Sequence, residues 1–434
     1  MNRIVVPVLL SSLLFACGPR PRPPVDAGME EDAGMEVDAG RPRGDDLPNG
    51  WQMALELPAG AAPSTKLGVS VAAIPDQFGY PTIAALYEDP NGDLNYDDNR
   101  VIYTRWDGVA KAFEPAKTIE VVGGAAFVHP NRQISIAREP VTGRIAIAYI
   151  KPQDNSVRVA FSDDEGANFS LTTVAVATGV GTVSNPSLGL VGDTVHVAFD
   201  DGGNLAYRKR VGSGAWTDEL TGSVSVTGPV SLAVDSAGNV GVAFLISNGM
   251  TADLGFWRPG NAVPAVIATA DNLDLTVSGR EPSVTLTFVG TTPNVAYHLR
   301  KLPDADATEL WYLKSTDSGS TWGTPIAIPR NSSGTEVHST RYYQALAVDP
   351  SGRVSVAAPW SATGTQTNCN GPKLSRAADG VNFMTCSPAG SPIQRGGDWI
   401  NLWTHKAAKQ TLVFQYDSRS NPSIKAGIVV WREP

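Results

Sequence analysis

The sequence has few charged residues and no concentrated run of basic side chains. Charged residues make up 18% of the 434 positions, and the formal net charge at pH 7 is −9. A protein that binds nucleic acid through its phosphates needs a basic surface. The few arginines near the N-terminus are too sparse to supply one, so we expect no nucleic-acid partner.

Residues that bind transition metals are also scarce. Three cysteines and five scattered histidines give no ligand spacing for zinc. One acidic stretch alternates oxygen-bearing side chains as calcium loops do, beginning with Asp89, Asn91 and Asp93. It lacks the glycine after the third ligand and the final glutamate, so a calcium site and a solvated hairpin loop both remain open. We expect no other cofactor.

The N-terminal apolar run, residues 4–16, is too short to span a bilayer. It follows Arg3 and is typical of a signal peptide, which we predict for residues 1–16. The run ends in Ala16-Cys17, which resembles a bacterial lipobox. This resemblance implies that Cys17 is lipidated and becomes the first residue of the mature protein. Ordinary cleavage beside an incidental cysteine is the alternative.

Residues 17–48 have the composition of a flexible tether. Asp-Ala-Gly recurs every six residues, starting at Asp26, Asp32 and Asp38, and the segment contains no aromatic residue. Such a chain cannot bury enough apolar surface to order itself. Gly18 follows the lipidated cysteine, and the usual sorting rule for such lipoproteins then implies the outer membrane. We therefore expect a body that is tethered to the cell envelope.

The two remaining cysteines, Cys369 and Cys386, form an even pair once Cys17 is lipidated. Exported proteins meet an oxidising environment, in which paired cysteines form disulfides. We predict a disulfide between them that clips a loop.

The body, residues 49–434, is built of repeats. An apolar strand and a turn precede a second strand with a small alanine after a β-branched residue. Copies recur about every 45 to 65 residues, the length of a four-stranded propeller blade. The second strands lie at residues 82–86, 145–149, 195–199, 240–244, 294–298, 354–358 and, in a weaker copy, 412–416.

The last copy has only three strands, at residues 398–404, 410–417 and 424–432. Residues 51–57 resemble residues 322–328, the fourth strand of the fifth copy. We predict an all-β, seven-bladed propeller whose last blade is closed by this N-terminal strand. Six blades is the alternative if one copy is misread.

Two turns carry a recognisable motif. The residues Ser315, Asp317, Gly319 and Trp322 match the Asp box of the sialidase-like (BNR-repeat) propellers. A second copy has phenylalanine for tryptophan, with Ser162, Asp164, Gly166 and Phe169. A third retains Gly380 and Phe383 but has Ala378 in place of the aspartate. The body thus resembles this superfamily at the level of the repeat, which implies the fold and not the function.

The resemblance also suggests a catalytic pair. Glu281 and Tyr343 each precede an inner strand, in contexts like those of the sialidase base and nucleophile. A carboxylate that takes the phenol proton would let the tyrosine oxygen attack a sugar. Arg300 resembles one arginine of the carboxylate clamp. However, Lys66 stands where the family's first clamp arginine is expected, and we find no match for the acid.

Arginines and aromatic residues also precede or open several inner strands. Arg132, Arg280 and Arg341 each precede an inner strand. With Tyr342, Tyr343, Trp360, Trp399 and Trp403 they would line a polar and aromatic funnel that suits a sugar or a peptide. Plain packing of the blades explains the same residues.

We therefore expect a monomeric, lipid-anchored scaffold that binds a glycan or a protein without catalysis. The alternatives are a sialidase-type glycoside hydrolase and a purely structural part of an envelope complex.

Overall fold

The computed structural model describes most of the body of the chain. It covers residues 48–58, 60–62, 64–124, 132–177, 182–220, 223–248, 252–270, 283–300, 308–328, 337–338, 344–361, 369–386, 396–404, 409–416 and 427–433. Some strand residues in these ranges are described by their backbone alone, among them Arg300, Cys369, Cys386 and Trp399. The predicted signal peptide, Cys17 and nearly all of the tether lie outside the described residues.

The described residues form seven antiparallel sheets, or blades, which are numbered in chain order and written from the innermost strand outward. Blade 1 contains β2 (Lys66–Pro75), β3 (Pro81–Glu88), β4 (Arg100–Asp107) and β6 (Lys117–Val121), with β5 (Ala112–Phe113) beside β4. Blade 2 contains β7 (Ile134–Arg138), β8 (Ile145–Lys151), β9 (Ser156–Ser162) and β10 (Ser170–Val176), and blade 3 contains β11 (Val183–Val191), β12 (Thr194–Asp201), β13 (Asn204–Val211) and β14 (Thr217–Asp218). Blade 4 contains β15 (Val226–Val234), β16 (Val240–Ser247), β17 (Ala252–Trp257) and β18 (Ala265–Ala270).

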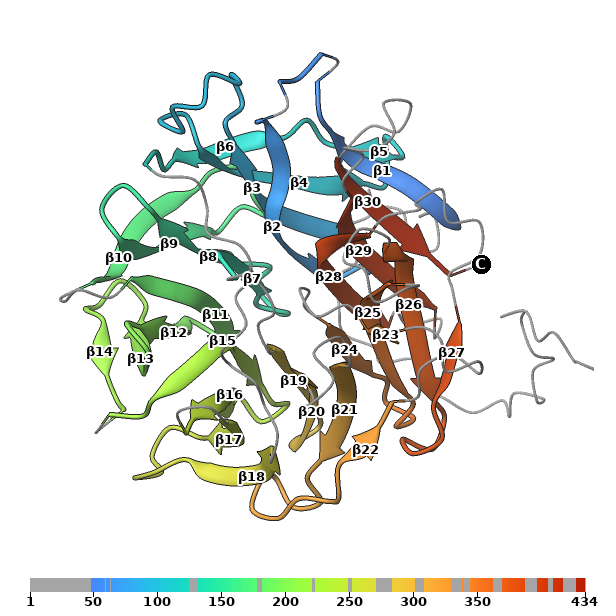
Figure 1. Cartoon of the computed structure of the whole chain (residues 1–434). Helices are drawn as coiled ribbons and strands as arrows, with labels where there is room; N and C mark the ends of the chain where they lie inside the picture. The colour runs from blue at the N-terminus through green and yellow to red at the C-terminus, as the bar shows by residue number, and fades with distance from the viewer. Residues whose placement is uncertain are drawn as a thin grey trace, which may run out of the picture.

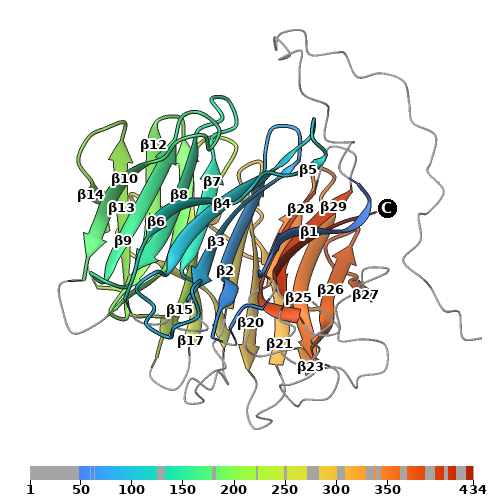
Figure 2. The same cartoon turned by 90° about the horizontal axis from the view of Figure 1, so that it is seen from above.

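The remaining three blades complete the ring. They are β19 (Ser283–Val289), β20 (Thr292–Arg300), β21 (Thr308–Lys314) and β22 (Ile326–Ala327); β23 (Val337–His338) with β24 (Ala345–Val348), then β25 (Val354–Ser361), β26 (Cys369–Ala377) and β27 (Met384–Cys386); and β28 (Gly396–Thr404), β29 (Gln410–Tyr416), β30 (Gly427–Arg432) and β1 (Gly50–Glu56). Figure 1 looks along the common axis of the blades, and Figure 2, turned by 90°, shows the ring edge-on. The fold is a seven-bladed β-propeller, which confirms the predicted fold class and rejects the six-bladed alternative.

The ring is closed by the N-terminal strand, as the sequence predicts. Strand β1 pairs antiparallel with β30, from Gly50 opposite Arg432 to Glu56 opposite Gly427. The ring of Trp51 lies edge-on to Phe414, with 5.4 Å between ring centroids. Because the two ends of the described body share one blade, their pairing holds the propeller shut (Figure 1).

The hydrophobic core lies between the blades. Each blade boundary holds one cluster of buried side chains, including the boundary between blade 7 and blade 1. The repeated second-strand alanines are buried; Ala148, Ala198 and Ala243 each have no exposed surface. A small side chain here lets neighbouring sheets approach where they converge on the axis. The repeat that reveals the fold is thus the packing surface itself.

Serines on the inner strands of blades 1 to 4 connect each of these blades to the next. The hydroxyl of Ser187 accepts a hydrogen bond of 2.8 Å from the Leu232 N–H, and Ser231 accepts one of 2.9 Å from Leu286. Ser70 and Ser135 bond the following blade in the same way, at 3.2 Å each. These bonds satisfy backbone groups that face the axis rather than a neighbouring strand.

The Asp box of blade 2 forms a compact turn. The Ser162 hydroxyl accepts the Gly166 N–H at 2.7 Å, and the Asp164 carboxylate accepts the Asn168 N–H at 2.8 Å. Hydrogen bonds from the Asn168 N–H, the Asn168 side chain and the Ser162 hydroxyl lower the pKa of Asp164 to about 2, because they favour the charged carboxylate. The ring of Phe169 then contacts Tyr103 on β4 of the preceding blade, with centroids 5.2 Å apart.

The Asp box of blade 5 repeats this arrangement. The Gly319 N–H donates to Ser315 at 2.8 Å, and Asp317 accepts the Thr321 hydroxyl at 2.9 Å. Trp322 meets Phe256 of blade 4 edge-on, with centroids 5.1 Å apart. The motif therefore fastens one blade to its predecessor.

The third copy, in blade 6, uses Asp379, although the motif places its aspartate at position 378. Asp379 accepts the Asn382 N–H at 2.8 Å, one residue after Ala378, and Phe383 contacts Tyr312 of blade 5 at 5.8 Å between centroids. The pKa of Asp379 is lowered to about 2 by its hydrogen bonds with the Asn382 and Val381 N–H groups and the Asn382 side chain. The turn is one residue shorter, but it keeps the carboxylate bond to the backbone and the aromatic contact with the preceding blade, so its function in the fold survives the change.

Candidate functional site

The strand order gives the propeller two different faces. Innermost strands such as β7 and β11 begin at one face, here called the upper face, which also carries the turns between second and third strands. The opposite, lower face carries the turns between first and second strands and between third and fourth strands. Every residue near a strand end can therefore be assigned to a face.

Only some of the residues that the sequence suggests for catalysis and binding lie in the described part of the chain. Arg280, Glu281, Arg341 and Tyr343 lie outside the described residues. The backbone of Arg300 ends β20 at the upper face, and that of Trp399 lies in β28. The structure therefore does not test whether Tyr343 and Glu281 lie close together, and their catalytic roles stay predictions.

Trp403 does not belong to the predicted funnel. It lies near the lower-face end of β28, is 8% exposed and packs in the cluster between blades 7 and 1 with Ile83 and Val413. The tryptophan fills an inter-blade gap, so the packing interpretation is correct for this residue.

Lys66, at the position where the resemblance would require an arginine, is already paired. It begins β2, and its ammonium group lies 2.8 Å from the Glu88 carboxylate. Glu88 is fully buried. A buried carboxylate needs a cation to balance it. Lys66 thus neutralises Glu88, which leaves this cation poorly suited to clamp a ligand carboxylate.

Asp200, at the upper-face end of β12, is a titratable group that sequence reasoning missed. Its carboxylate accepts the Gly203 N–H at 2.6 Å and the Ser184 hydroxyl at 3.3 Å. Burial raises its pKa to about 6, since desolvation disfavours the charged form. An Asp-Asp-Gly-Gly turn reads as an ordinary hairpin, so the sequence carries no signal of this shift.

The Asp-rich loop between β3 and β4 uses its side-chain oxygens within the loop. Asp89 accepts the Leu94 N–H, Asn91 accepts the Asp93 N–H, and Asp93 accepts the Asn95 N–H, at 2.9 to 3.3 Å. Across the described residues, no group of three or more His, Cys, Asp or Glu side chains is placed to hold a metal ion. These bonds explain the loop's shape, and calcium at Asp89, Asn91 and Asp93 stays a prediction.

The predicted cysteine pair lies on adjacent strands of blade 6. Cys369 is opposite Ser361 on β25, and Cys386 is opposite Leu374 on β26. The partner of Cys386 is thus five residues along β26 from Cys369, about 16 Å at the usual rise per residue. The side chains of both cysteines lie outside the described part, and the disulfide stays a prediction.

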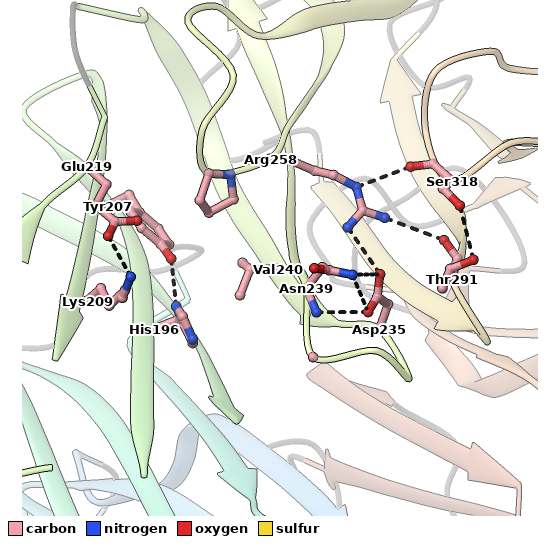
Figure 3. A pocket seen from close by; sticks show the side chains of 12 residues that line it. His196, Tyr207, Lys209, Glu219, Asp235, Asn239, Val240, Arg258, Thr291 and Ser318 are labelled. Atoms are coloured by element: carbon pink, nitrogen blue, oxygen red, sulfur yellow. Dashed lines mark hydrogen bonds and ion pairs between the residues drawn. The ribbon is translucent and has the colours of Figure 1, made fainter. Parts of the chain in front are cut away.

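A pocket of about 450 Å³ opens on the lower face, between blades 3 and 4 and beside blade 5. Blade 3 supplies one wall and the turns of blades 4 and 5 supply the other (Figure 3). The lining residues are His196, Tyr207, Lys209, Glu219, Asp235, Gly238, Asn239, Val240, Arg258, Pro259, Thr291 and Ser318. The volume lies in the range of small-molecule sites in proteins, about 300 to 1,000 Å³.

On the blade 3 wall, a buried histidine and tyrosine are bonded to each other. His196 Nδ1 lies 2.6 Å from the Tyr207 hydroxyl, and Tyr207 has no exposed surface. Burial and the nearby Lys209 ammonium lower the pKa of His196 to about 4. Burial also raises the pKa of Tyr207 well above its usual range. Both rings are therefore uncharged at neutral pH.

A partly exposed ion pair lies on the same wall of the pocket. Lys209 Nζ lies 2.7 Å from Glu219 Oε1, and each side chain is about one-third exposed (33% and 31%). Lys209 belongs to β13, and Glu219 directly follows β14. The two side chains lie together on the blade 3 side of the pocket, next to His196 and Tyr207 (Figure 3).

The opposite wall is organised by Arg258. Its guanidinium lies 3.2 Å from Asp235 Oδ2 and donates to the carbonyl oxygens of Ser318 at 3.2 Å and Thr291 at 3.4 Å. Asn239 donates its amide N–H to Asp235 at 3.2 Å. One arginine thus holds turns from two blades in a fixed arrangement (Figure 3).

This pocket offers hydrogen bonds and balanced charge rather than an activated nucleophile. Its two cations are each paired with a carboxylate, and its histidine is neutral. Sequence reasoning missed the pocket because its residues come from seven separate segments, in strands and in turns. No spacing connects them, and only the Asp-box residue Ser318 lies in a motif.

Comparison with known proteins identifies no family. No family model and no curated protein sequence matches the chain. Solved structures do match. A fungal alcohol oxidase of the AA5 family, in complex with copper, is 12% identical, with 89% of this chain and 76% of that chain covered and a TM-score of 0.51.

Sialidases are also among the matching structures. The Trypanosoma rangeli sialidase is 10% identical, with 73% of this chain covered and a TM-score of 0.43. A sialidase from Streptococcus pneumoniae is 9% identical, with 78% of this chain and 71% of that chain covered and a TM-score of 0.45. The chain spans 56% of the length of the trypanosomal enzyme. At these identities, the likeness concerns the propeller fold alone.

Proposed function

We propose that this protein is a lipid-anchored propeller of the bacterial envelope that binds a glycan or a protein without changing it chemically. The observation that carries the proposal is the lower-face pocket, which is open, polar and balanced in charge. Preformed hydrogen-bonding groups around a concave surface are suited to recognition. We infer that the propeller acts as a monomer and needs neither nucleic acid nor a redox cofactor.

The paired state of Lys66 further favours binding over sialoside hydrolysis. A sialidase needs free cations to hold the sugar carboxylate, in the bidentate manner of arginine. Lys66 is already satisfied by a buried carboxylate at 2.8 Å. The funnel of Arg280, Arg300, Arg341 and Trp399 that the sequence suggests stays part of this proposal.

Hydrolysis of a fluorogenic sialoside by the full chain in detergent tests this proposal. We expect no turnover above that of a Tyr343→Phe variant. Tyr342→Phe is the matched control, because it removes a neighbouring phenol hydroxyl. Turnover that Tyr343→Phe abolishes and Tyr342→Phe leaves intact would establish the sialidase instead, with Glu281 as the base.

The anchor has a separate test. Cells that express the full chain are labelled with radioactive palmitate and fractionated. We expect labelled protein in the outer membrane fraction, and no label in a Cys17→Ser variant. A wild-type chain that carries no label would overturn the anchored part of the proposal. Its detection in the inner membrane alone would overturn the outer-membrane part.

A further inference from the structure

We infer that the lower-face pocket binds a neutral saccharide unit. This inference rests on the proposed binding function and goes further by naming the site and the class of ligand. The site lies on the face opposite the upper-face ends of β20 and β28, where Arg300 and Trp399 lie. It is therefore distinct from the funnel that the sequence suggests.

The balance of charge selects a neutral ligand. Lys209 and Arg258 contribute two positive charges, and Glu219 and Asp235 contribute two negative charges. An anion that approaches Lys209 also meets Glu219, and a cation that approaches Glu219 also meets Lys209. Because like charges close together are costly, neither kind of ion gains a net attraction. A polar ligand without charge pays no such penalty.

The pocket lining offers both hydrogen-bond donors and acceptors, which a sugar's hydroxyls require. Lys209 has three N–H donors and directs one of them at Glu219. Asn239 donates its amide nitrogen to Asp235, which orients its carbonyl oxygen as an acceptor. Thr291 accepts from Ser318 at 3.0 Å and keeps its own O–H as a donor. Each sugar hydroxyl both donates and accepts, so a mixed lining suits it.

An apolar strip lies between the two polar walls. Val240, which is 5% exposed, lies between the side of His196 and Tyr207 and the side of Asp235 (Figure 3). Pro259 also lines the pocket. A pyranose ring has C–H faces that pack on such surfaces. The combination of apolar floor and polar rim is the usual composition of a ligand pocket.

The far wall is fixed before any ligand arrives. Arg258 bonds two turns and one carboxylate, and its guanidinium also lies over the rings of Phe256 at 5.7 Å and Phe288 at 5.1 Å. A wall that is already ordered loses little conformational freedom on binding. This lowers the cost of recognising a small neutral ligand, which brings no charge to compensate.

Binding to printed oligosaccharides tests the inference. The full chain in detergent is applied to neutral oligosaccharides of hexose and N-acetylhexosamine units, beside sialylated and uronate-containing ones of equal length. We expect the neutral set to be bound, and Glu219→Gln and Lys209→Met each to weaken binding about tenfold or more. The matched control is Asp218→Asn, which breaks the adjacent Arg208–Asp218 ion pair outside the pocket and should leave affinity within about twofold.

The outcomes separate this inference from the proposed function. Neutral binding that Asp218→Asn preserves and the two pocket variants weaken supports the site. Binding of acidic oligosaccharides alone, or neutral binding that both pocket variants leave intact, overturns the site but leaves a binding scaffold. If no oligosaccharide is bound, the saccharide inference fails. The scaffold then depends on whether cross-linking in cells traps a protein partner.

Both pocket variants should remain folded. The Lys209–Glu219 pair is about one-third exposed, and exposed ion pairs contribute little to stability. Thermal unfolding of each variant checks this. A variant that unfolds at the wild-type temperature but no longer binds has lost recognition alone.

Discussion

The ring of Phe169 meets the ring of Tyr103 edge-on across the boundary between blades 2 and 1, with 66° between the ring planes. Gly166, in the same turn, approaches that tyrosine so closely that a Cβ would lie 2.4 Å from its ring. Tyr103 is 1% exposed and has no room to retreat. The glycine of the Asp box is therefore required by the neighbouring blade as well as by its own turn.

Gly166→Ala should destabilise the propeller strongly. Its φ of +88° costs a side chain about 1–2 kcal/mol, and displacing the buried tyrosine adds about 1–3 kcal/mol. Gly203→Ala is the control, since its φ is +90° but nothing lies within 4 Å of the added carbon. Urea unfolding should show a clearly larger loss for Gly166→Ala. Equal losses would mean that the inter-blade contact does not matter.

The Asp-box carboxylates should make stability depend on acid pH. Asp164 and Asp379 have pKa values lowered to about 2 by hydrogen bonds from their own turns. An unfolded aspartate has a pKa of about 3.9. Their stabilisation is therefore complete above about pH 4 and is lost as the pH falls toward 2. Thermal unfolding from pH 2 to 5 should show a shallower decline in an Asp164→Asn, Asp379→Asn double variant. An unchanged decline would contradict the assignment.

His196 should make the stability of the fold depend on pH in a higher range than the two aspartates do. Its pKa is lowered to about 4, first by burial and then by Lys209, against about 6.5 when unfolded. The neutral ring is favoured in the fold, so stability is complete above about pH 6.5 and falls between 6.5 and 4, by roughly 3 kcal/mol in total. His196→Gln should remove this part of the pH dependence. The same slope in the variant would show that other groups titrate there.

The serine links between inner strands should contribute measurably to stability. Ser231, which is 4% exposed, accepts the Leu286 N–H of the next blade. Ser231→Ala leaves that buried donor unpaired, which costs about 1–3 kcal/mol. The control is Ser236→Ala in an exposed turn, where the described hydrogen bond uses the backbone N–H. Denaturant midpoints should shift for Ser231→Ala alone, and a shift of similar size in both would refute the link.

The repeat made the fold predictable, because the residues that recur are those that pack between blades. The predicted strands 398–404, 410–417 and 424–432 lie close to the observed Gly396–Thr404, Gln410–Tyr416 and Gly427–Arg432. Inner-strand alanines and alternating apolar residues report burial directly. The borrowed strand β1 was predictable because a three-stranded last blade requires a partner.

The pocket was not predictable, because its charged residues do not belong to the repeating pattern that reveals the strands. Its charges come from turns and strand ends, where no period constrains the sequence. Arg258 lies 23 residues from Asp235 and 60 from Ser318, and only the folded ring brings them within hydrogen-bonding distance. The shortened Asp box at Asp379 was missed because a fixed spacing cannot anticipate a turn that is one residue shorter.

The pairing of β1 with β30 has a mechanical consequence. The chain enters the body at Gly50, opposite Arg432, at the lower-face end of blade 7. With the anchor proposed at Cys17, any force between membrane and bound ligand would pass through this single seam. A pull along the strand axis loads all of its hydrogen bonds together in shear, whereas a sideways pull breaks them one after another from Gly50. The direction in which the ligand pulls would thus set the force at which the ring opens.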